Sequence, residues 1–276
     1  MLAFGIAIGG RPGARLLPEV GSVVSGDRLL RAVVTVPLPV ASSPRILGVD
    51  DWSLRKRHTC DSSICVATGA DPNALAGELR EFLELAAAIG APQIRVFGGP
   101  WPDGRAAREI YDTVAALLNA VAPDAERRGV AIVLETHDTL ASARAVAVIL
   151  ERVPSRAIGA LWDAHHPYRM GEQPDEVLTA LGARLLHFHV KDARRNEVAR
   201  TGWDLLLLGK GENPVESSLK ARVGSGYDGW VAVEWEKKWH LHIAEPEVAL
   251  PRHAHLLRAW LDAGGDGRQG PDATGG

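Results

Sequence analysis

The stretch GVAIVLETHDTLASARAVAVILERVPSRAIGALWDAHHP (129–167) holds two short apolar runs separated by one helical segment. The runs GVAIVLETHD (129–138) and AIGALWDAHH (157–166) are rich in Val, Ile and Leu, and both end in acidic and histidine residues. Between them, ASARAVAVILERV (141–153) has apolar residues at helical spacing. This order predicts a strand, a helix and a second parallel strand, the unit of parallel α/β sheets.

The same alternation of strand and helix runs from about residue 60 to residue 263. Further apolar runs predict strands at 62–68, 92–99, 184–193, 204–212 and 229–239. Further periodic segments predict helices at 71–90, 105–122, 174–182, 214–226 and 246–263. Asp71 can cap the first of these helices and Gly90 can end it. The seven strand candidates predict an α/β fold, a single (β/α)8 TIM barrel, that needs one more strand.

The first 60 residues should supply that strand, although Gly and Pro are scattered through them. We favour RAVVTVPLPV (31–40), which leaves room for a short helix at 50–58; AFGIAI (3–8) is the alternative. The Gly-rich polar tail (264–276) is expected to be disordered, because it has little apolar surface to offset the entropy of ordering. No linker divides the remainder, so we expect one domain over residues 1–263.

Composition narrows the class of protein. With 276 residues and 46% hydrophobic residues, the chain is long enough to bury a large core. The net charge of −3 gives no basic face for nucleic acid. No apolar run of about 18 residues predicts a membrane span, and no signal segment is evident. The two cysteines, Cys60 and Cys65, are read as ordinary thiols of a cytoplasmic protein.

Polar residues gather where the predicted strands end, the face on which parallel barrels place their catalytic groups. These residues are Glu135 and His137; Asp163, His165 and His166; His187, His189, Lys191 and Asp192; and Glu234 with Glu236. Alternation along a strand places His187 and His189 on the same face. Three carboxylates and one imidazole from four strands suit octahedral Mn²⁺, Mg²⁺ or Co²⁺ with positions open for substrate, and Zn²⁺ stays a candidate.

The segments LETHDT (134–139), LWDAHHP (161–167), HFHVKDA (187–193) and GYDGWVAVEWEKKWH (226–240) resemble the sugar phosphate isomerase/epimerase superfamily, the xylose isomerase-like barrel. The resemblance extends from about residue 62 to 255. It implies one divalent ion bound by Glu135, Asp163, His189 and Glu234. It also implies a metal-dependent isomerase or epimerase that acts on a sugar, sugar phosphate or related polyol ketone through a metal-stabilised enediolate.

The resemblance also implies roles for individual residues. Glu135 and Glu234 would remove and return a proton on opposite faces of the substrate. His166 and Arg195 match positions that relatives use to contact substrate. Lys191 either stabilises the developing oxyanion or forms a salt bridge to Asp192 or a neighbour. The remaining histidines are expected to support the ligands through hydrogen bonds; they are His137, His165 and His187.

Other functions stay open at this stage. Position 141, six residues after Glu135, is Ala where ketose 3-epimerases carry a second glutamate, so the substrate is not specified. An inosose-dehydratase-type lyase would use the same metal and the same enolate. An abasic-site endonuclease is disfavoured, because its extra histidines are absent from SSICVAT (62–68) and PQIRVFGG (92–99). A non-catalytic sugar-binding barrel is the last alternative. A homodimer is the default assembly.

Overall fold

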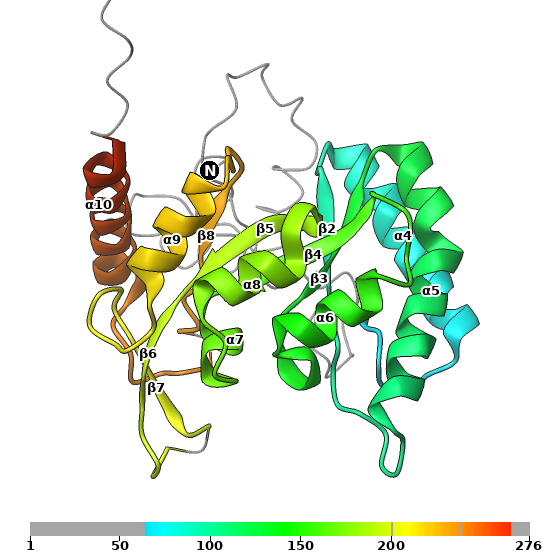
Figure 1. The fold of residues 1–276 in the computed structure, drawn as a ribbon, viewed down its shortest axis with the longest axis horizontal. Coiled ribbons are helices and arrows are strands. Elements are labelled where there is room, and N and C mark those ends of the chain that lie inside the picture. The colour runs from blue at the N-terminus through cyan, green and yellow to red at the C-terminus, as the bar shows by residue number, and fades with distance from the viewer. Residues whose placement is uncertain (1–63, 200, 238, 266–276) are drawn as a thin grey trace, which may run out of the picture. The chain divides into compact units, whose positions relative to one another are not determined.

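The computed structural model describes residues 64–199, 201–237 and 239–265. Within these residues, six parallel strands pair in the order β1-β2-β3-β4-β5-β8 (Figure 1). The strands are β1 (Ile64–Cys65), β2 (Gln93–Phe97), β3 (Ala131–Glu135), β4 (Ile158–Asp163), β5 (Leu185–Val190) and β8 (Val231–Val233). The curled parallel sheet confirms the predicted α/β fold of barrel type, and each of these strands falls inside a predicted run.

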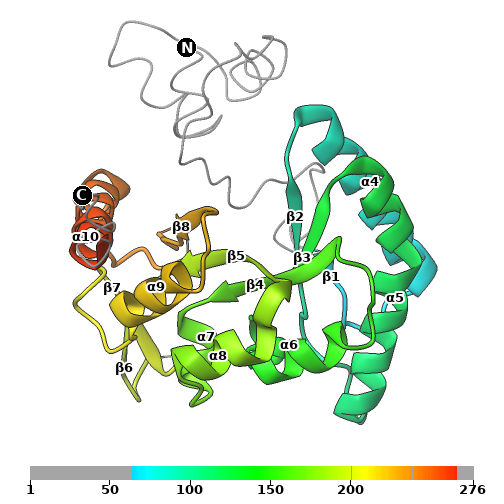
Figure 2. The same cartoon turned by 45° about the horizontal axis from the view of Figure 1, so that its top comes forward.

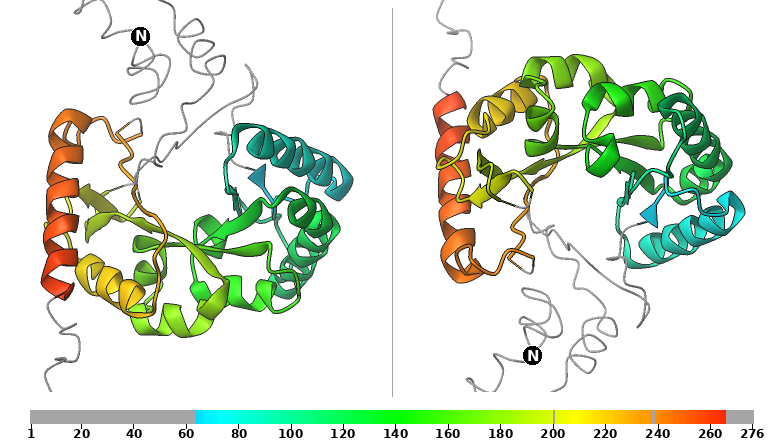
Figure 3. Two further views of the ribbon diagram at one scale, coloured as in Figure 1. Left: turned by 90° about the horizontal axis from the view of Figure 1, so that it is seen from above. Right: turned by 90° about the horizontal axis from the view of Figure 1, so that it is seen from below.

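Helices follow the strands in the predicted alternation and lie outside the curled sheet (Figure 3). They are α4 (Pro72–Ile89), α5 (Ala107–Arg128), α6 (Ala143–Leu150), α7 (His165–Arg169), α8 (Pro174–Leu181), α9 (Val215–Gly224) and α10 (Pro246–Gly265), with 3-10 turns η2 (Asp138–Leu140) and η3 (Gly182–Arg184). As expected, the Asp71 side chain accepts from the Asn73 backbone N–H at 3.1 Å, and Gly90 ends α4 with a φ of 73°. None of the described helices combines the length and apolarity that crossing a membrane requires.

Two predicted helix ends were wrong. The helix predicted at 105–122 begins at Ala107 and continues through Pro123 to Arg128. Burial of Val121, Ala122 and Ala125 against the core outweighs the proline in its last turns. The predicted start of the disordered tail, residue 264, is also wrong, because α10 continues to Gly265.

The strand predicted at 204–212 is not part of the parallel sheet. Residues Trp203–Leu206 form β7, which pairs in antiparallel fashion with β6 (Asp192–Arg195) in a separate hairpin that extends away from the sheet (Figure 2). Its apolar residues have their own small core, in which Leu205 packs with Ala193 and Ile243. The apolar residues of β7 are therefore accounted for by the hairpin and its small core, and not by the parallel sheet.

The core lies between the sheet and its helices. Trp162 of β4 and Phe188 of β5 are buried side by side, with ring centroids 4.7 Å apart, on the helix-facing side of the sheet. Leu79 and Leu83 of α4 are fully buried in the same cluster. Because neighbouring positions of a strand face opposite ways, Asp163 and His189 project to the other side.

Some predictions lie outside the described residues. These are the strand candidates at 31–40 and 3–8, the helix at 50–58, and the tail from residue 266 onward. The single domain over 1–263 stays a prediction for the same reason.

Replacing Phe188 with Ala should lower the free energy of unfolding by about 3–5 kcal/mol, because it leaves a cavity beside Trp162. Phe188→Leu should cost less, since it keeps most of the apolar volume. Chemical denaturation followed by circular dichroism would measure both. As a control, Val198→Ala, at a side chain 94% exposed, should change stability by less than about 0.5 kcal/mol. Equal losses in all three variants would contradict this description of the core.

Candidate metal centre

Four side chains meet where the strands of the parallel sheet end. Glu135 is the last residue of β3, Asp163 is the last of β4, His189 lies in β5, and Glu234 directly follows β8. All four are buried, and each offers one ligand atom that lies within 4.8 Å of the others. Parallel pairing explains this convergence: Asp163 is the register partner of His189, and the Glu234 N–H donates to Val190 O at 3.1 Å.

These side chains have lone pairs to offer a cation. Both carboxylate oxygens of Glu135 and the Nδ1 atom of His189 are buried without a hydrogen-bond partner among the described residues. The His189 Nδ1 atom is 3.8 Å from Glu135 Oε1 and 3.9 Å from Glu234 Oε2. Buried polar atoms are nearly always satisfied, so unpartnered oxygen and nitrogen atoms facing one another fit a bound divalent ion.

Two cations lie against the cluster. The Lys191 ammonium, 3% exposed, contacts Asp163 Oδ2 at 3.2 Å and Glu234 Oε2 at 2.9 Å. It also contacts Glu236 Oε1 at 2.8 Å. The Arg95 Nη1 atom of β2 is 3.4 Å from Glu135 Oε2 and 3.9 Å from Glu234 Oε1.

Among the described residues, the charge of the carboxylates is only partly balanced. When Glu135, Asp163, Glu234 and Glu236 are all ionised, Lys191 and Arg95 leave a net charge of −2. A buried group of this kind needs its charge paired. One divalent ion would neutralise the charged side chains described here.

The pKa shifts of the buried carboxyl groups reflect the same excess of negative charge. Burial, followed by the charge of Glu234, raises the pKa of Glu135 well above its ordinary value. Burial likewise raises the pKa of Asp163. Burial also favours a high pKa for Glu234, but the Lys191 ammonium together with hydrogen bonds to His189 and Asp163 outweighs it and holds that pKa well below the ordinary value. A cation among these carboxylates would therefore favour their ionised forms.

Two of the predicted supporting histidines, His165 and His187, are neutral rings. Burial is the main cause that lowers the pKa of His165 to about 4 and that of His187 to about 3. The His165 Nδ1 atom lies 3.1–3.2 Å from the side-chain amide of Asn213. His187 shares its face with His189, as the alternation predicts, and their ring centroids are 5.1 Å apart. His137 is held at its Nδ1 by Asp138 Oδ1 at 2.9 Å.

His166 differs from the other rings. It is 5% exposed, and neither ring nitrogen has a hydrogen-bond partner among the described residues. Burial lowers its pKa well below the ordinary value, so it is a neutral imidazole. Its ring packs edge-on against His137, with centroids 4.2 Å apart. Its free nitrogens leave it able to bind a substrate oxygen.

Arg195 does not join the cluster. It lies in the β6–β7 hairpin with its side chain 70% exposed and its nearest ion-pair partner, Glu197, at 3.8 Å. The hairpin itself touches the site through Trp203, whose ring packs edge-on against His165 with centroids 5.1 Å apart. Contact of Arg195 with a substrate stays a prediction.

Sequence reasoning missed Arg95 and Asn213. Arg95 lies in QIRVF, a strand that is otherwise mostly apolar, and its guanidinium lies over the Phe97 ring at 4.6 Å. A lone arginine inside an apolar strand was the available signal. Asn213 had no signal: its Nδ2 donates to Lys191 O at 2.9 Å and so links that residue to His165.

Asp192 anchors the loop that carries Asn213. Its carboxylate accepts from the N–H groups of Gly211 and Asn213 at 2.9 and 3.2 Å. It is not among the ion-pair partners of Lys191, which are Asp163, Glu234 and Glu236. Lys191 therefore forms salt bridges with these neighbours and not with Asp192. Its stabilisation of an oxyanion stays a prediction. A side chain at Gly211 would place its Cβ 2.1 Å from Asp192 Oδ1, so this position needs glycine.

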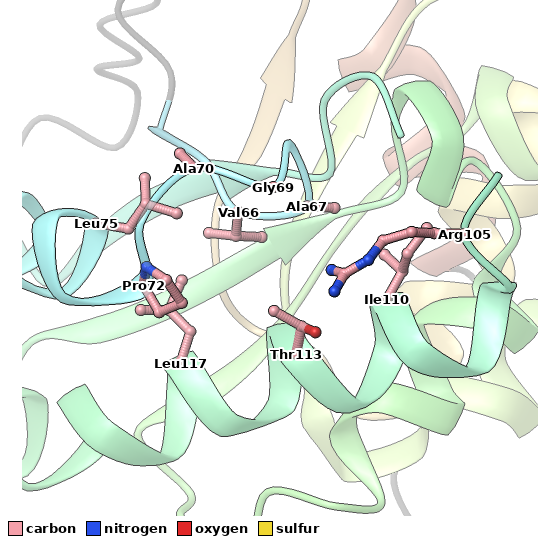
Figure 4. A pocket seen from close by; sticks show the side chains of 10 residues that line it. All are labelled: Val66, Ala67, Gly69, Ala70, Pro72, Leu75, Arg105, Ile110, Thr113 and Leu117. Carbon is pink, nitrogen blue, oxygen red and sulfur yellow. The ribbon is translucent and has the colours of Figure 1, made fainter. Parts of the chain in front are cut away.

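A pocket lies between the segment that follows β1 and helix α5 (Figure 4). Its walls come from the segment that follows β1, including Val66 and Gly69, and from α5, including Ile110 and Thr113. Arg105 is the one charged side chain among the residues that line it. None of the four residues of the cluster lines this pocket.

Comparisons with known proteins give the family. The family described as xylose isomerase-like TIM barrel matches residues 67–260. Inosose dehydratases from two strains of Clostridium perfringens are 24% identical over 157 residues, or 52% of this chain and 50% of theirs. The chain thus spans about half the length of the curated relatives it matches.

Solved structures show the same fold. A D-tagatose 3-epimerase-like protein is 20% identical, with a TM-score of 0.61 over 74% of this chain and 76% of its own. The IOLI protein, solved with a bound zinc atom, is 18% identical, with a TM-score of 0.62 over 73% and 75%. A xylose isomerase domain protein from Planctomyces limnophilus is 22% identical, with a TM-score of 0.57 over 70% and 67%.

Replacing Gly211 with Ala should lower the free energy of unfolding by about 1–3 kcal/mol, because the new Cβ would overlap Asp192 Oδ1 and the Ala193 carbonyl. Thermal unfolding would measure the loss. Gly224→Ala is the matched control, since no atom lies within 4 Å of its added Cβ, and it should leave the midpoint unchanged or slightly raised. Identical midpoints for both variants would show that the loop is not anchored as described.

Proposed function

The chain belongs to the xylose isomerase-like TIM barrel family, and on that basis we propose that it is a divalent-metal-dependent isomerase or epimerase of a sugar, sugar phosphate or related polyol ketone. The observation that carries the proposal is the buried group of three carboxylates and one imidazole at the ends of four neighbouring strands. The fold neighbours named as epimerases support it.

Glu135, Asp163, His189 and Glu234 would hold the ion. Three oxygen donors and one nitrogen donor suit Mn²⁺, Mg²⁺ or Co²⁺. Zn²⁺ is a further candidate, because a fold neighbour was solved with a zinc atom. When bound, the ion would act as a Lewis acid that stabilises negative charge developing on a substrate oxygen.

The chain's own side chains would move the proton. Glu135 and Glu234 come from different strands, β3 and the end of β8, and would remove and return a proton on the carbon next to the carbonyl. The Lys191 ammonium, beside Glu234, would stabilise charge on a neighbouring oxygen. His166, with both nitrogens unpartnered among the described residues, would orient a hydroxyl group.

A dehydratase is the second candidate function. The curated relatives are inosose dehydratases, and a lyase would begin with the same proton removal before it expels a hydroxyl group. The described side chains could begin either reaction. An abasic-site endonuclease is not favoured, because no histidine lies in β1 or β2 and the net charge is −3.

His189→Ala should abolish metal binding while the fold is kept. Replacing a residue that only supports a ligand costs about 10–100-fold in metal affinity, so loss of a ligand should cost more than about 100-fold. Elemental analysis after dialysis against Mn²⁺ would give the stoichiometry, with circular dichroism as the check on folding. His242→Ala, at an exposed histidine, is the control and should keep the metal. One retained equivalent in His189→Ala would exclude this ligand set.

Incubation with pooled ketoses, aldoses, their phosphates and inososes in D₂O should produce metal-dependent deuterium exchange at a carbon next to a carbonyl. NMR and mass spectrometry would locate the label; loss of water would identify the lyase, and its absence the isomerase or epimerase. Glu135→Gln and Glu234→Gln should each slow exchange by about 100-fold or more, because each removes a proton-transfer group. Full exchange in both variants would contradict their assignment.

A further inference from the structure

Three carboxylates contact the Lys191 ammonium. Its ammonium is 3% exposed and contacts Asp163 Oδ2 at 3.2 Å, Glu234 Oε2 at 2.9 Å and Glu236 Oε1 at 2.8 Å. Its backbone carbonyl is also held, by Asn213 Nδ2 at 2.9 Å. The positive charge is therefore fixed at the edge of the cluster and does not reach solvent.

Two of these three partners are proposed metal ligands. Asp163 and Glu234 belong to the group of four, and the ammonium lies 3.2 Å from Asp163 Oδ2 and donates a hydrogen bond of 2.9 Å to Glu234 Oε2. A divalent cation at the same carboxylates would be repelled by Lys191 and would compete with it for negative charge. In a buried site this repulsion is only weakly screened.

The third partner, Glu236, lies outside the group of four. It binds the ammonium through Oε1, while its Oε2 is 3.3 Å from His240 Nε2. Its backbone carbonyl accepts from Trp239 and His240 at 3.0 and 2.9 Å, which closes a tight turn after β8. Glu236 is thus held in place to draw the ammonium toward itself and to neutralise its charge.

We propose that Lys191 and Glu236 form a charge pair that sets how tightly the site binds its divalent ion. Lys191 lowers the affinity for the ion, and Glu236 offsets that effect. The inference rests on the proposed function, because it requires a divalent ion at Glu135, Asp163, His189 and Glu234. The proposal predicts whether each substitution raises or lowers the affinity for the ion. If Lys191 instead served as a scaffold that orients Asp163 and Glu234, its removal would weaken metal binding.

The first test is Lys191→Met, which removes the charge and keeps nearly the same volume. Titration with Mn²⁺ at fixed pH and ionic strength, followed by calorimetry, should show a Kd at least about tenfold lower than that of the native protein. Weaker or unchanged binding would overturn the proposal. The metal-induced rise in unfolding temperature, measured on the same samples, should also be larger in this variant, because the metal-free protein loses its internal cation.

The second test is Glu236→Gln, which keeps the shape and removes the charge. With Lys191 uncompensated, its Mn²⁺ Kd should be about three- to tenfold higher than the native value. In the double variant Lys191→Met/Glu236→Gln, the added effect of Glu236→Gln should fall below about twofold, because the two residues act on the metal as a pair. An undiminished effect would mean that Glu236 acts directly on the ion, and would overturn the pairing. The single variant Glu236→Gln tests the proposal even where Lys191→Met folds poorly.

The pair Glu216 and Lys220 of α9 supplies matched controls. Their ion pair is half-exposed and belongs to no part of the cluster. Glu216→Gln and Lys220→Met should leave the Mn²⁺ Kd unchanged within about twofold.

Failure of this inference can be told from failure of the proposed function. A native protein that binds no divalent ion, from Mn²⁺ to Zn²⁺, would overturn both. A native protein that binds one equivalent and loses it in His189→Ala, but whose affinity is unmoved by Lys191→Met and Glu236→Gln, would overturn only the charge pair.

Discussion

The repulsion among buried carboxylates is the constraint around which this structure is organised. Glu135, Asp163, Glu234 and His189 are buried, and each offers a ligand atom within 4.8 Å of the others. Burial raises the pKa of Glu135 and of Asp163, and the charge of the neighbouring Glu234 adds to the effect. Two built-in cations, Lys191 and Arg95, remove part of that cost. When Glu236, the third carboxylate partner of Lys191, is counted as well, the described side chains keep a net charge of −2, which one divalent ion would balance.

The packing of the core keeps the carboxylates close to one another. Every residue of β4 is buried, and its helix-facing side chain Trp162 is packed against Phe188. Asp163 and His189 alternate with those two residues, so they cannot turn away from the site without pulling aromatic rings out of the core. The packing free energy of the core therefore holds in place a site that is electrostatically unfavourable without its ion.

Much of the site could be predicted from sequence because strands obey a simple rule. Polar residues that follow apolar runs in a parallel sheet collect at one edge, and alternation sorts them by face. That rule correctly placed His187 beside His189. Trp235, which follows Glu234, packs its ring against His253 of α10, with centroids 5.0 Å apart.

The features that the sequence did not predict have physical causes as well. The run 204–212 is as apolar as a barrel strand, but hydrophobicity does not reveal the pairing partner; that partner proved to be β6, in a hairpin with its own small core. Arg95 was missed because one charged residue in an apolar strand has meaning only once the strand's neighbours are known. Asn213 acts through contacts that connect residues 22 and 48 positions away in sequence, which no local pattern records.

The histidines near the cluster add hydrogen-bonding groups without adding charge. His165 and His166 are buried, His187 is half-buried, and all three have lowered pKa values. Under the proposed function, the carboxylates and a bound ion would serve one step, removal of a proton next to a carbonyl, which epimerisation and dehydration share. The two reactions would diverge only when a proton returns or a hydroxyl departs. On this proposal, the outcome would depend on how the imidazoles and the surrounding loops hold the substrate's hydroxyl groups, and not on the charged cluster itself.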